Sequence, residues 1–454
     1  MDSRKQYMEL FDGNREAIDA GSAPVMNALR GKAAVQFGSM PFHRKGEEGY
    51  KRTDVNEMFA PDYGVNVNRV NIPVDVARSW RCDVPNMSTL LGVVVNDAFV
   101  ASQGLAERLP KGVTFCSLRQ AALQQPELVA AHYGTLAEGA DAAVALNTML
   151  AQDGVFIHVE KNVRLEKPLQ LVNIFSAPMP LLAPRRVLIV MEEGAEARLL
   201  VCDHTQDAAQ KYLSAEVVEV VMKPGSRFDY YTIEESSGNT GRYSQMFVRQ
   251  EEGSNIMVNN SMLTCGCTRN NYSVDLTGEH CEARLAGMAI ASGRMKVDNA
   301  VNMRHLAPRC KSDQLFKYVA DDESQCAFQG LILVDNKAPF TDAYQTCRSV
   351  LASTEARMFA KPQLEIYNDE VKCSHGATTG QLDAEALFYM RTRGIPEAEA
   401  RTMLMQAFMS DVIDTVRLEG LRDRLRHLVE KRFSGVQANC ADCHTSCKNA
   451  DNEL

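Results

Sequence analysis

No stretch of the sequence is apolar for long enough to cross a lipid bilayer as a helix. Such a helix needs about 20 consecutive apolar residues, and the longest apolar runs, Leu90–Val95 and Val187–Met191, are far shorter. The N-terminal segment Met1–Gly21 also lacks the apolar centre of a secretion signal. We therefore expect a protein of the cytoplasm that has no membrane partner.

Positive charge is also scarce. The chain has 49 Lys and Arg residues against 58 Asp and Glu residues, a formal net charge of -9. Because nucleic-acid phosphates are bound by clustered Lys and Arg, this balance argues against a nucleic-acid partner. The apolar fraction of 45% is ordinary for a globular protein, and 454 residues favour two or three domains.

The short motifs that carry common catalytic chemistry are missing as well. The sequence contains no Gly-x-x-x-x-Gly-Lys-Ser/Thr loop, so we expect no ATP bound through a P-loop. It contains neither a Gly-x-Ser-x-Gly elbow nor a His-Glu-x-x-His helix. These absences predict that the chain is not an enzyme.

What the sequence does contain is a long region of short, alternating, β-branched runs between Val155 and about Val350. Turn signals recur within it at Glu193-Gly194-Ala195, Pro224-Gly225-Ser226 and Glu252-Gly253-Ser254, and Gly278 falls at the next expected place. The glycines are 31, 28 and 25 residues apart by subtraction. Such a period predicts a mainly β protein with a parallel β-helix core, in which stacked coils bury their inner faces. An irregular β-sandwich is the alternative.

A β-helix also leaves a carbohydrate-active enzyme open as a rival function. Such an enzyme needs two carboxylates on one face of the coils. No carboxylate spacing in the sequence singles out such a pair, but neighbouring coils can assemble one. A carboxylate pair on one exposed face of the β-helix would favour this rival.

Helical patterns flank the β region. We divide the chain into a mixed α/β, largely helical domain (residues 1–150), the β-helix core (151–380), a helical domain (381–432) and a polar, Cys-rich tail (433–454). Asp383 is placed to cap the first C-terminal helix, and Gly394 and Pro396 separate it from the next. Four arginines in the last helical stretch, Arg417, Arg422, Arg424 and Arg426, read as a solvated face.

Potential metal ligands occur at three places. Cys373 and His375 are two residues apart, so on an extended chain they face the same side, and both can ligate a soft or borderline metal. By spacing alone, a polar corner at a domain junction is the more ordinary explanation. Cys265-Gly266-Cys267 reads as two strand thiols, in keeping with 13 scattered cysteines that we expect to be mostly reduced and buried.

The third place is the tail, where four ligand-type residues fall within eight positions: Cys440, Cys443, His444 and Cys447. A zinc or iron–sulfur site and an exposed thiol tail both stay open. The Cys-x-x-Cys-His string also matches haem attachment, which conflicts with the missing export signal. A metal- or redox-binding protein that acts through this tail is therefore the second rival function.

The segments Pro362–Tyr367, Val371–Asp383 and Leu387–Ile395 together resemble the SufB/SufD family. The version Cys-Ser-His-Gly-Ala-Thr at Cys373–Thr378 is similar to the SufD branch, because the SufB branch carries Glu-His-Glu-Ala-Thr at this place. Weaker similarity extends back to about residue 115, so the resemblance covers most of the chain. The Cys-rich tail is not part of the family pattern.

This resemblance implies a right-handed parallel β-helix between an N-terminal α/β region and a C-terminal helical domain. It also implies a non-catalytic scaffold in a complex with one SufB and two copies of the ATPase SufC, a complex that assembles iron–sulfur clusters. SufB would pair with the end of the β-helix. Whether the isolated chain forms a homodimer is left open.

The resemblance also implies where the partners meet this chain. His375 would take part in a transient iron–sulfur cluster at the SufB interface, with Cys373 as its less certain neighbour, and no cofactor would stay bound to the isolated chain. The helical domain would receive SufC. We expect the docking surface at the turn formed by Arg391, Arg393, Gly394, Ile395 and Pro396, which exposes donors and an apolar corner.

Overall fold

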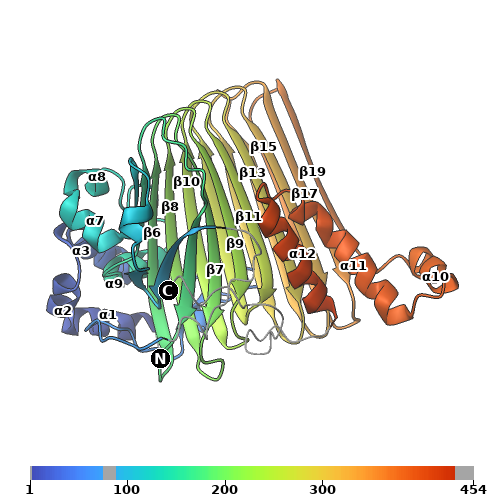
Figure 1. The fold of residues 1–454 in the computed structure, drawn as a ribbon, viewed down its shortest axis with the longest axis horizontal. Coiled ribbons are helices and arrows are strands. Elements are labelled where there is room, and N and C mark those ends of the chain that lie inside the picture. The colour runs from blue at the N-terminus through green and yellow to red at the C-terminus, as the bar shows by residue number, and fades with distance from the viewer. Residues whose placement is uncertain (1–2, 75–87, 435–454) are drawn as a thin grey trace.

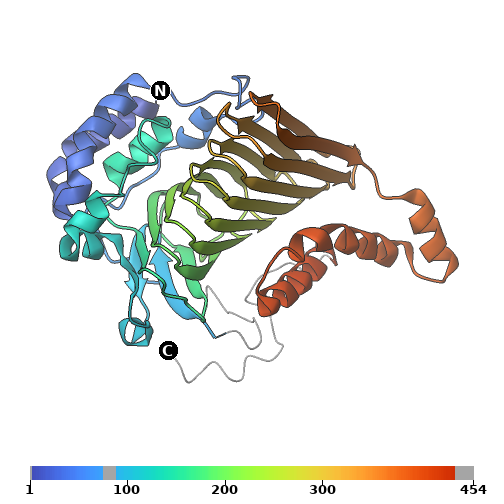
Figure 2. The same cartoon turned by 90° about the horizontal axis from the view of Figure 1, so that it is seen from above.

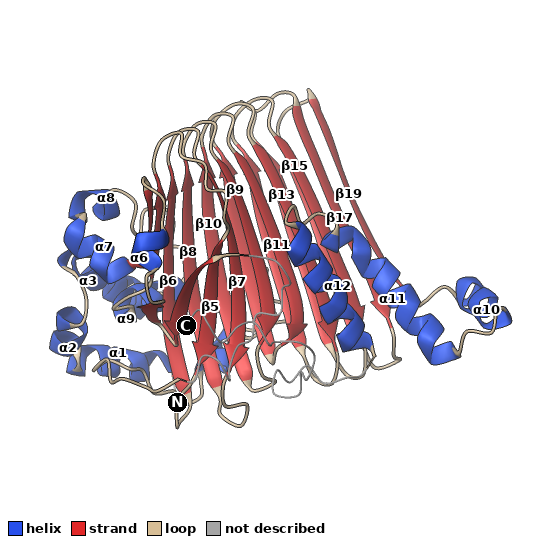
Figure 3. Ribbon diagram, in the orientation of Figure 1, coloured by secondary structure: helices blue, strands red, loops and turns tan. Residues whose placement is uncertain are grey.

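Two long sheets run side by side through the computed structural model, which describes residues 3–74 and 88–434 (Figures 1 and 3). One sheet has ten strands in the order β19-β17-β15-β13-β11-β9-β7-β5-β1-β2, and the other has nine in the order β18-β16-β14-β12-β10-β8-β6-β4-β3. From β4 onward the chain visits the two sheets alternately, and neighbouring strands within each sheet are parallel. The core is therefore a parallel β-helix, as the repeat predicted.

The strands of the first sheet are β1 (Leu90–Val95), β2 (Ala98–Ala101), β5 (Leu169–Phe175), β7 (Glu196–Thr205), β9 (Arg227–Glu235), β11 (Asn255–Thr264), β13 (Glu282–Ala291), β15 (Lys311–Ala320), β17 (Thr341–Leu351) and β19 (Val371–Gly380). Those of the second are β3 (Val113–Ser117), β4 (Val155–Val159), β6 (Leu181–Met191), β8 (Tyr212–Met222), β10 (Thr240–Gln250), β12 (Cys267–Leu276), β14 (Lys296–His305), β16 (Gln325–Val334) and β18 (Arg357–Ile366). The helices are α1 (Ser3–Gly13), α2 (Arg15–Ala20), α3 (Pro24–Ser39), α4 (Val55–Phe59), α6 (Leu105–Arg108), α7 (Leu118–Gln124), α8 (Pro126–Ala130), α9 (Ala142–Leu150), α10 (Ala384–Thr392), α11 (Glu397–Ile413) and α12 (Glu419–Phe433).

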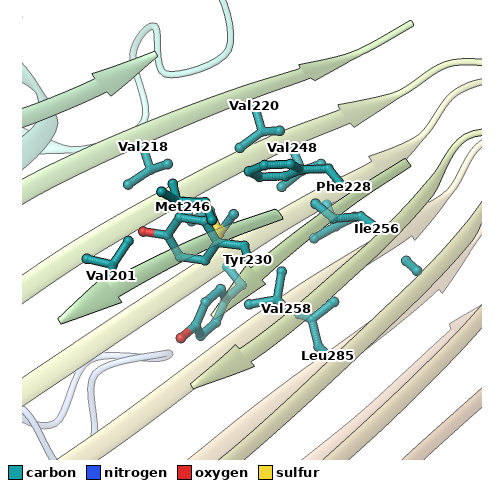
Figure 4. Close-up of a cluster of buried hydrophobic side chains, with 14 of the residues drawn as sticks. Val201, Val218, Val220, Phe228, Tyr230, Met246, Val248, Ile256, Val258 and Leu285 are labelled. Carbon is teal, nitrogen blue, oxygen red and sulfur yellow. The ribbon is translucent and has the colours of Figure 1, made fainter. Parts of the chain in front are cut away.

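The space between the two sheets is filled by alternate residues of every strand. Val218, Met246, Tyr272 and Val301 occupy the same register position in four successive strands of one sheet. Figure 4 shows such side chains from neighbouring strands meeting in one cluster. Because successive strand residues face opposite sides, this period of two sends one apolar set inward. Each fully buried side chain of this kind contributes about 1.5–3 kcal/mol.

One corner of the β-helix repeats a left-handed residue in every coil. The residues at this position have φ between +58° and +67°, and they are Asn162, Gly194, Gly225, Gly253, His280, Arg309 and Phe340. Each donates its backbone N–H to a carbonyl of the next coil, as Gly194 does to Pro224 at 2.9 Å. The turns of neighbouring coils are thus hydrogen-bonded to one another, as the strands are.

The expectation that Gly278 continues this turn repeat is wrong, because His280 holds the left-handed position. Gly278 is needed for another reason: a Cβ there would lie 2.1 Å from the Glu252 backbone nitrogen. From Gly253 onward the repeat advances by 27, 29 and 31 residues by subtraction, through three residues that are not glycine.

The N-terminal helices cover the outer face of the second sheet. Residues of α1, α3, α4 and α9 pack against Leu182, Leu213 and Tyr243 of β6, β8 and β10. The β1–β2 hairpin and α6 close the first coil, where Phe99, Leu105 and Leu109 pack against the inner core. Strands β1 and β3 belong to the region that we assigned to the N-terminal domain (residues 1–150), yet they pair with β5 and β4 and so join the two sheets of the β-helix.

The C-terminal helices cover part of the outer face of the first sheet. Lys317 of β15 donates to the Phe408 carbonyl at 2.7 Å, and Asn259 of β11 donates to the Val412 carbonyl at 3.0 Å. Figure 2 shows α11 and α12 along the sheet while α10 projects away from it. Asp383 caps α10 by accepting from the Glu385 and Ala386 N–H groups, as expected.

The expectation of a solvated arginine face is wrong for Arg424, which is buried, and holds only in part for Arg422, which is half-buried. Arg417 precedes α12, is exposed, and pairs with Asp229 of β9 at 2.7 Å. Arg426 lies at the surface beside Asp414 and Asp423. The helix docks on the sheet, so charges on its inner side find partners there. In the described ranges, no helix has both the length and the apolar composition that a bilayer crossing requires.

A charged network lies inside the β-helix near its first coils. Arg242 contacts Asp203, Glu216 and Glu234 at 2.5–2.8 Å, and Arg185 contacts Asp203 at 2.6 Å. Burial would raise the pKa of Asp203, but Arg242 and Arg185 hold it below its usual value. Burial, together with the Asp203 charge, raises the pKa of Glu234 to about 7. Three carboxyls share two guanidinium groups, and this excess of negative charge adds to burial in raising the pKa of Glu234.

Glu234 should therefore make stability fall as the pH rises. Its folded pKa of about 7 exceeds the ordinary 4.5, so its contribution is complete below about pH 4.5 and is lost as the pH passes about 7. The full effect is about 3 kcal/mol. Glu234→Gln should flatten this dependence in chemical denaturation between pH 5 and 8.5, whereas Asp313→Asn at the surface should leave it intact. An unchanged profile in Glu234→Gln would contradict the assignment.

Candidate functional site at the open end of the β-helix

No described strand continues the β-helix beyond its last coil, so the end of that coil is uncovered. Strand β19 pairs only with β17, and β18 pairs only with β16, so each has one free edge among the described residues. Large apolar side chains lie exposed near this end: Phe340, Tyr344, Ile366 and Tyr367. Free edges present unpaired N–H and C=O groups that can pair with another chain. This open end is the candidate site.

The Cys373–Thr378 motif lies within β19 itself rather than at a corner beyond the strands. In the parallel register Cys373 stands beside Ala343, and His375 stands beside Gln345. Ala343 and Gln345 are buried in the β-helix interior. Cys373 and His375 therefore continue the inner face of the coils at the point where the coils stop.

The two side chains differ in their surroundings. Cys373 is half-buried, packs against the inner core, and has its thiol pKa raised by burial. His375 is exposed. Thiolate and imidazole suit soft and borderline metals such as iron. Within residues 3–74 and 88–434, however, no group of three or more His, Cys, Asp or Glu side chains is placed to hold a metal ion. A site that uses this pair needs ligands from a partner.

Polar side chains lie directly behind His375. Gln345, which is 1% exposed, donates to Gln314 of β15 at 2.8 Å. Gly330 leaves the room for it, because a Cβ there would lie 2.0 Å from the Gln345 amide nitrogen. The Gln345 side-chain oxygen is buried and accepts no hydrogen bond from the described residues. Gln314, Gln345 and His375 therefore form a row of polar side chains on the inner face of three successive strands of the first sheet.

The turn between α10 and α11 is exposed on all sides. No residue of α10 is buried, and Phe388 and Tyr389 are 69% and 58% exposed. Arg393 bonds the Tyr389 hydroxyl at 3.0 Å and lies over its ring, and Arg391 pairs with Glu397 at 3.2 Å. Gly394 takes a φ of +87°, and Pro396 then precedes the first turn of α11. Two aromatic rings and two guanidinium groups thus project from the body together.

The other predicted ligand residues divide into two groups. Cys440, Cys443, His444 and Cys447 fall outside the described residues, so the structure does not test the prediction for the tail. Cys265 lies in the core, where burial raises its thiol pKa to about 12, and half-buried Cys267 lines a separate cavity. The nine described cysteines are all free thiols, six of them buried, which agrees with reduced core cysteines.

Two carboxylates on the outer faces of the coils are paired with arginines. Asp275 pairs with Arg304 at 2.5 Å, and Asp313 pairs with Arg284 at 3.1 Å. Three cavities in the described part of the chain are lined by one carboxylate each: Glu138, Glu57 and Asp298. None of these cavities holds the pair that a carbohydrate-active enzyme requires.

The chain is thus a parallel β-helix protein whose core is closed at one end and, among the described residues, open at the other. Comparison with known families narrows this class. A family model described as the SUF system FeS cluster assembly SufBD core domain matches residues 175–408, more than half of the chain, and one described as the SufBD N-terminal region matches residues 1–171. The chain belongs to the SufB/SufD family, and its likeness to SufD proteins places it in the SufD branch.

Three relatives illustrate the likeness. An iron–sulfur cluster assembly SufBD family protein of Synechocystis is 28% identical over 408 residues, which are 88% of this chain and 89% of the relative. The iron–sulfur cluster assembly protein SufD of Escherichia coli is 29% identical over 65% of this chain and 70% of its own. A chloroplastic protein of Arabidopsis thaliana is 26% identical over 94% of this chain and 90% of its own.

Because the β-helix ends after β19, we expect Gln345 and His375, which occupy equivalent positions in the last two coils, to contribute differently to the free energy of unfolding. Gln345→Ala should lower the free energy of unfolding by about 2–3 kcal/mol, because it leaves the buried side-chain oxygen of Gln314 without its donor. His375→Ala, one coil further out, should change it by less than about 0.5 kcal/mol. Chemical denaturation of both variants measures the contrast. Equal losses would mean that His375 is as enclosed as Gln345.

Proposed function

We propose that this chain is a non-catalytic scaffold subunit of a SufBCD-type complex that assembles iron–sulfur clusters. In this proposal the open end of the β-helix pairs with a SufB-like subunit, and the α10–α11 turn receives a SufC-like ATPase. The observation that carries the proposal is the uncovered last coil, with Cys373 and His375 on the continuation of the inner face. Membership of an iron–sulfur cluster assembly family supports the chemistry.

The pairing with a SufB-like subunit is supported by the geometry of β18 and β19. Two free strand edges and four exposed apolar side chains form a surface that a second β-helix end fits by continuing the coils. The same surface allows a homodimer when the isolated chain has no partner. His375 and Cys373 then face the partner, which supplies the missing ligands for a transient cluster.

Docking of a SufC-like ATPase is supported by the composition of the α10–α11 turn. Exposed aromatic and arginine side chains are enriched at the centres of protein interfaces, and Phe388, Tyr389 and Arg393 are grouped here on a helix that nothing covers among the described residues. α11 continues from this turn onto the first sheet, so a partner held by the turn has a rigid connection to the β-helix.

The scaffold role agrees with the chemistry that the chain lacks. It has no phosphate-cradling loop, so the ATPase activity of such a complex would come from the SufC-like partner. Each of the three cavities described above is lined by a single carboxylate, so none of them presents the pair that glycoside hydrolysis uses. With no nucleic-acid or membrane partner proposed, we place the complex in the cytoplasm.

Co-expression with SufB-like and SufC-like chains tests the complex, and Arg393→Glu tests the docking turn. The three chains should elute together in size-exclusion chromatography. Arg393→Glu should weaken capture of the ATPase at least tenfold in a pull-down, because it reverses a charge at the centre of the proposed surface. The matched control Arg426→Glu, on the exposed side of α12, should leave capture intact. Equal capture by both variants would remove the turn from the interface.

His375→Ala should reduce iron and sulfide reconstitution on the assembled complex several-fold while the complex still forms. The reason is the loss of one imidazole ligand from an exposed position whose truncation leaves no core cavity. Iron and acid-labile sulfide per complex give the measurement, and the melting temperature of the chain gives the control. Iron and sulfide contents equal to those of the wild-type complex in His375→Ala would contradict the role assigned to His375.

A further inference from the structure

A segment of the N-terminal region crosses the outer face of the second sheet as a strap, which we define as residues 43–54. Tyr50 bonds the Tyr243 hydroxyl of β10 at 3.0 Å, and Thr53 donates to Asp298 of β14 at 2.6 Å. The Arg52 guanidinium lies over the Phe359 ring of β18 at 3.5 Å. In Figure 2 the blue N-terminal part of the chain reaches the brown last strands. The strap thus spans the coils up to the open end.

A cavity of about 370 Å³ lies between the strap and the sheet. Its volume falls within the range of small-molecule sites. Four cationic side chains line it, two from the strap and two from the sheet: Lys51, Arg52, Arg269 and Lys361. Asp298 is the one carboxylate in the lining. Such a concentration of positive charge is notable in a chain whose net charge is -9.

The single carboxylate of the lining, Asp298, already has hydrogen-bond and ion-pair partners. Asp298 accepts from Thr53 and pairs with the buried Arg269 at 2.7 Å. Arg269 also donates to Asn271 at 2.9 Å and lies over the Tyr50 ring. These contacts hold the cavity floor in a fixed arrangement, and the lining has no other carboxylate for the remaining three cations. Lys361 has one exposed contact with Glu48, at 3.4 Å.

Arg52 and Lys51 are the cations without an anionic partner among the described residues. The Phe359 ring supports one face of the Arg52 guanidinium, which restricts its rotation. No described residue accepts a hydrogen bond from its edge. An arginine stacked on an aromatic ring keeps a planar set of N–H donors that matches carboxylate and phosphate oxygens in pairs. The arrangement therefore presents a ready anion-binding fork beside a second free charge.

We propose that this cavity binds a small polyanion that carries two or more carboxylate or phosphate groups. One group is bound by the Arg52 fork and Lys51, and a second is bound by Lys361 on β18 beside the Gln329 amide. The ligand joins the strap to the last strand of the second sheet. The site lies on the outer face of β18, next to the free edge that we propose for partner pairing, but its ligand binding can be measured on the chain without any partner.

Isothermal titration of the full chain with citrate and with pyrophosphate, at constant ionic strength, tests the proposal. We expect saturable binding of at least one of them, with one site per chain. Citrate alone would identify a carboxylate ligand, and pyrophosphate alone a phosphate ligand. Absence of saturable binding by both would overturn the site.

Variants locate the binding. Arg52→Ala and Lys51→Ala should each weaken it at least tenfold, whereas Lys45→Ala, an exposed cation of the strap outside the cavity lining, should leave it unchanged. Arg52→Lys should also bind more weakly, because it keeps the charge and loses the fork. Thermal unfolding of each variant confirms that it is folded. Wild-type affinity in Arg52→Ala, or equal weakening in Lys45→Ala, would overturn the assignment.

Discussion

The inner face of the coils is mostly apolar, and each coil needs the next one to cover it. This constraint sets the length and the ends of the whole molecule. At the first coil, the β1–β2 hairpin and α6 provide the cover. At the last coil the described chain provides none, so β18 and β19 keep free edges. The site proposed for partner pairing is therefore a direct consequence of how a β-helix is built, since a coil left open must find its neighbour in another chain.

The outer faces of the two sheets are covered by different parts of the chain. The second sheet carries the N-terminal helices and the strap, whereas the first carries α11 and α12 and leaves α10 projecting. The β-helix between them is rigid, because backbone hydrogen bonds link every coil to the next. Such a body holds three surfaces at fixed positions: the open end, the α10–α11 turn and the strap cavity. Their chemistry differs. The open end presents strand edges together with Cys373 and His375, the α10–α11 turn presents aromatic and arginine side chains, and the strap cavity presents cations.

Much of the fold could be predicted because apolar alternation marks the strands directly. The runs near Val187–Met191 and Val217–Met222 lie within β6 and β8. Strands such as β14 and β19 were harder to predict, since their inner faces carry polar residues, for example Asn299, which bonds Asn270 at 3.0 Å. The same limitation hid the buried charges around Arg242. A charged residue looks solvated in the sequence until a strand of another coil supplies the opposite charge, as Glu216 does for Arg242 at 2.6 Å.

By itself the sequence determined the coil period, the alternation of the strands, the cap at Asp383 and the motif that marks the SufB/SufD family. All of these depend on residues close together along the chain or on the rotation of side chains about a single strand. Only the tertiary structure decided that Gln345 is enclosed and His375 exposed, although the two occupy one register position. It also decided that Arg52 meets Phe359 across about 300 residues of chain. Exposure and long-range contact depend on which coils stack and where stacking ends, and no local pattern contains that information.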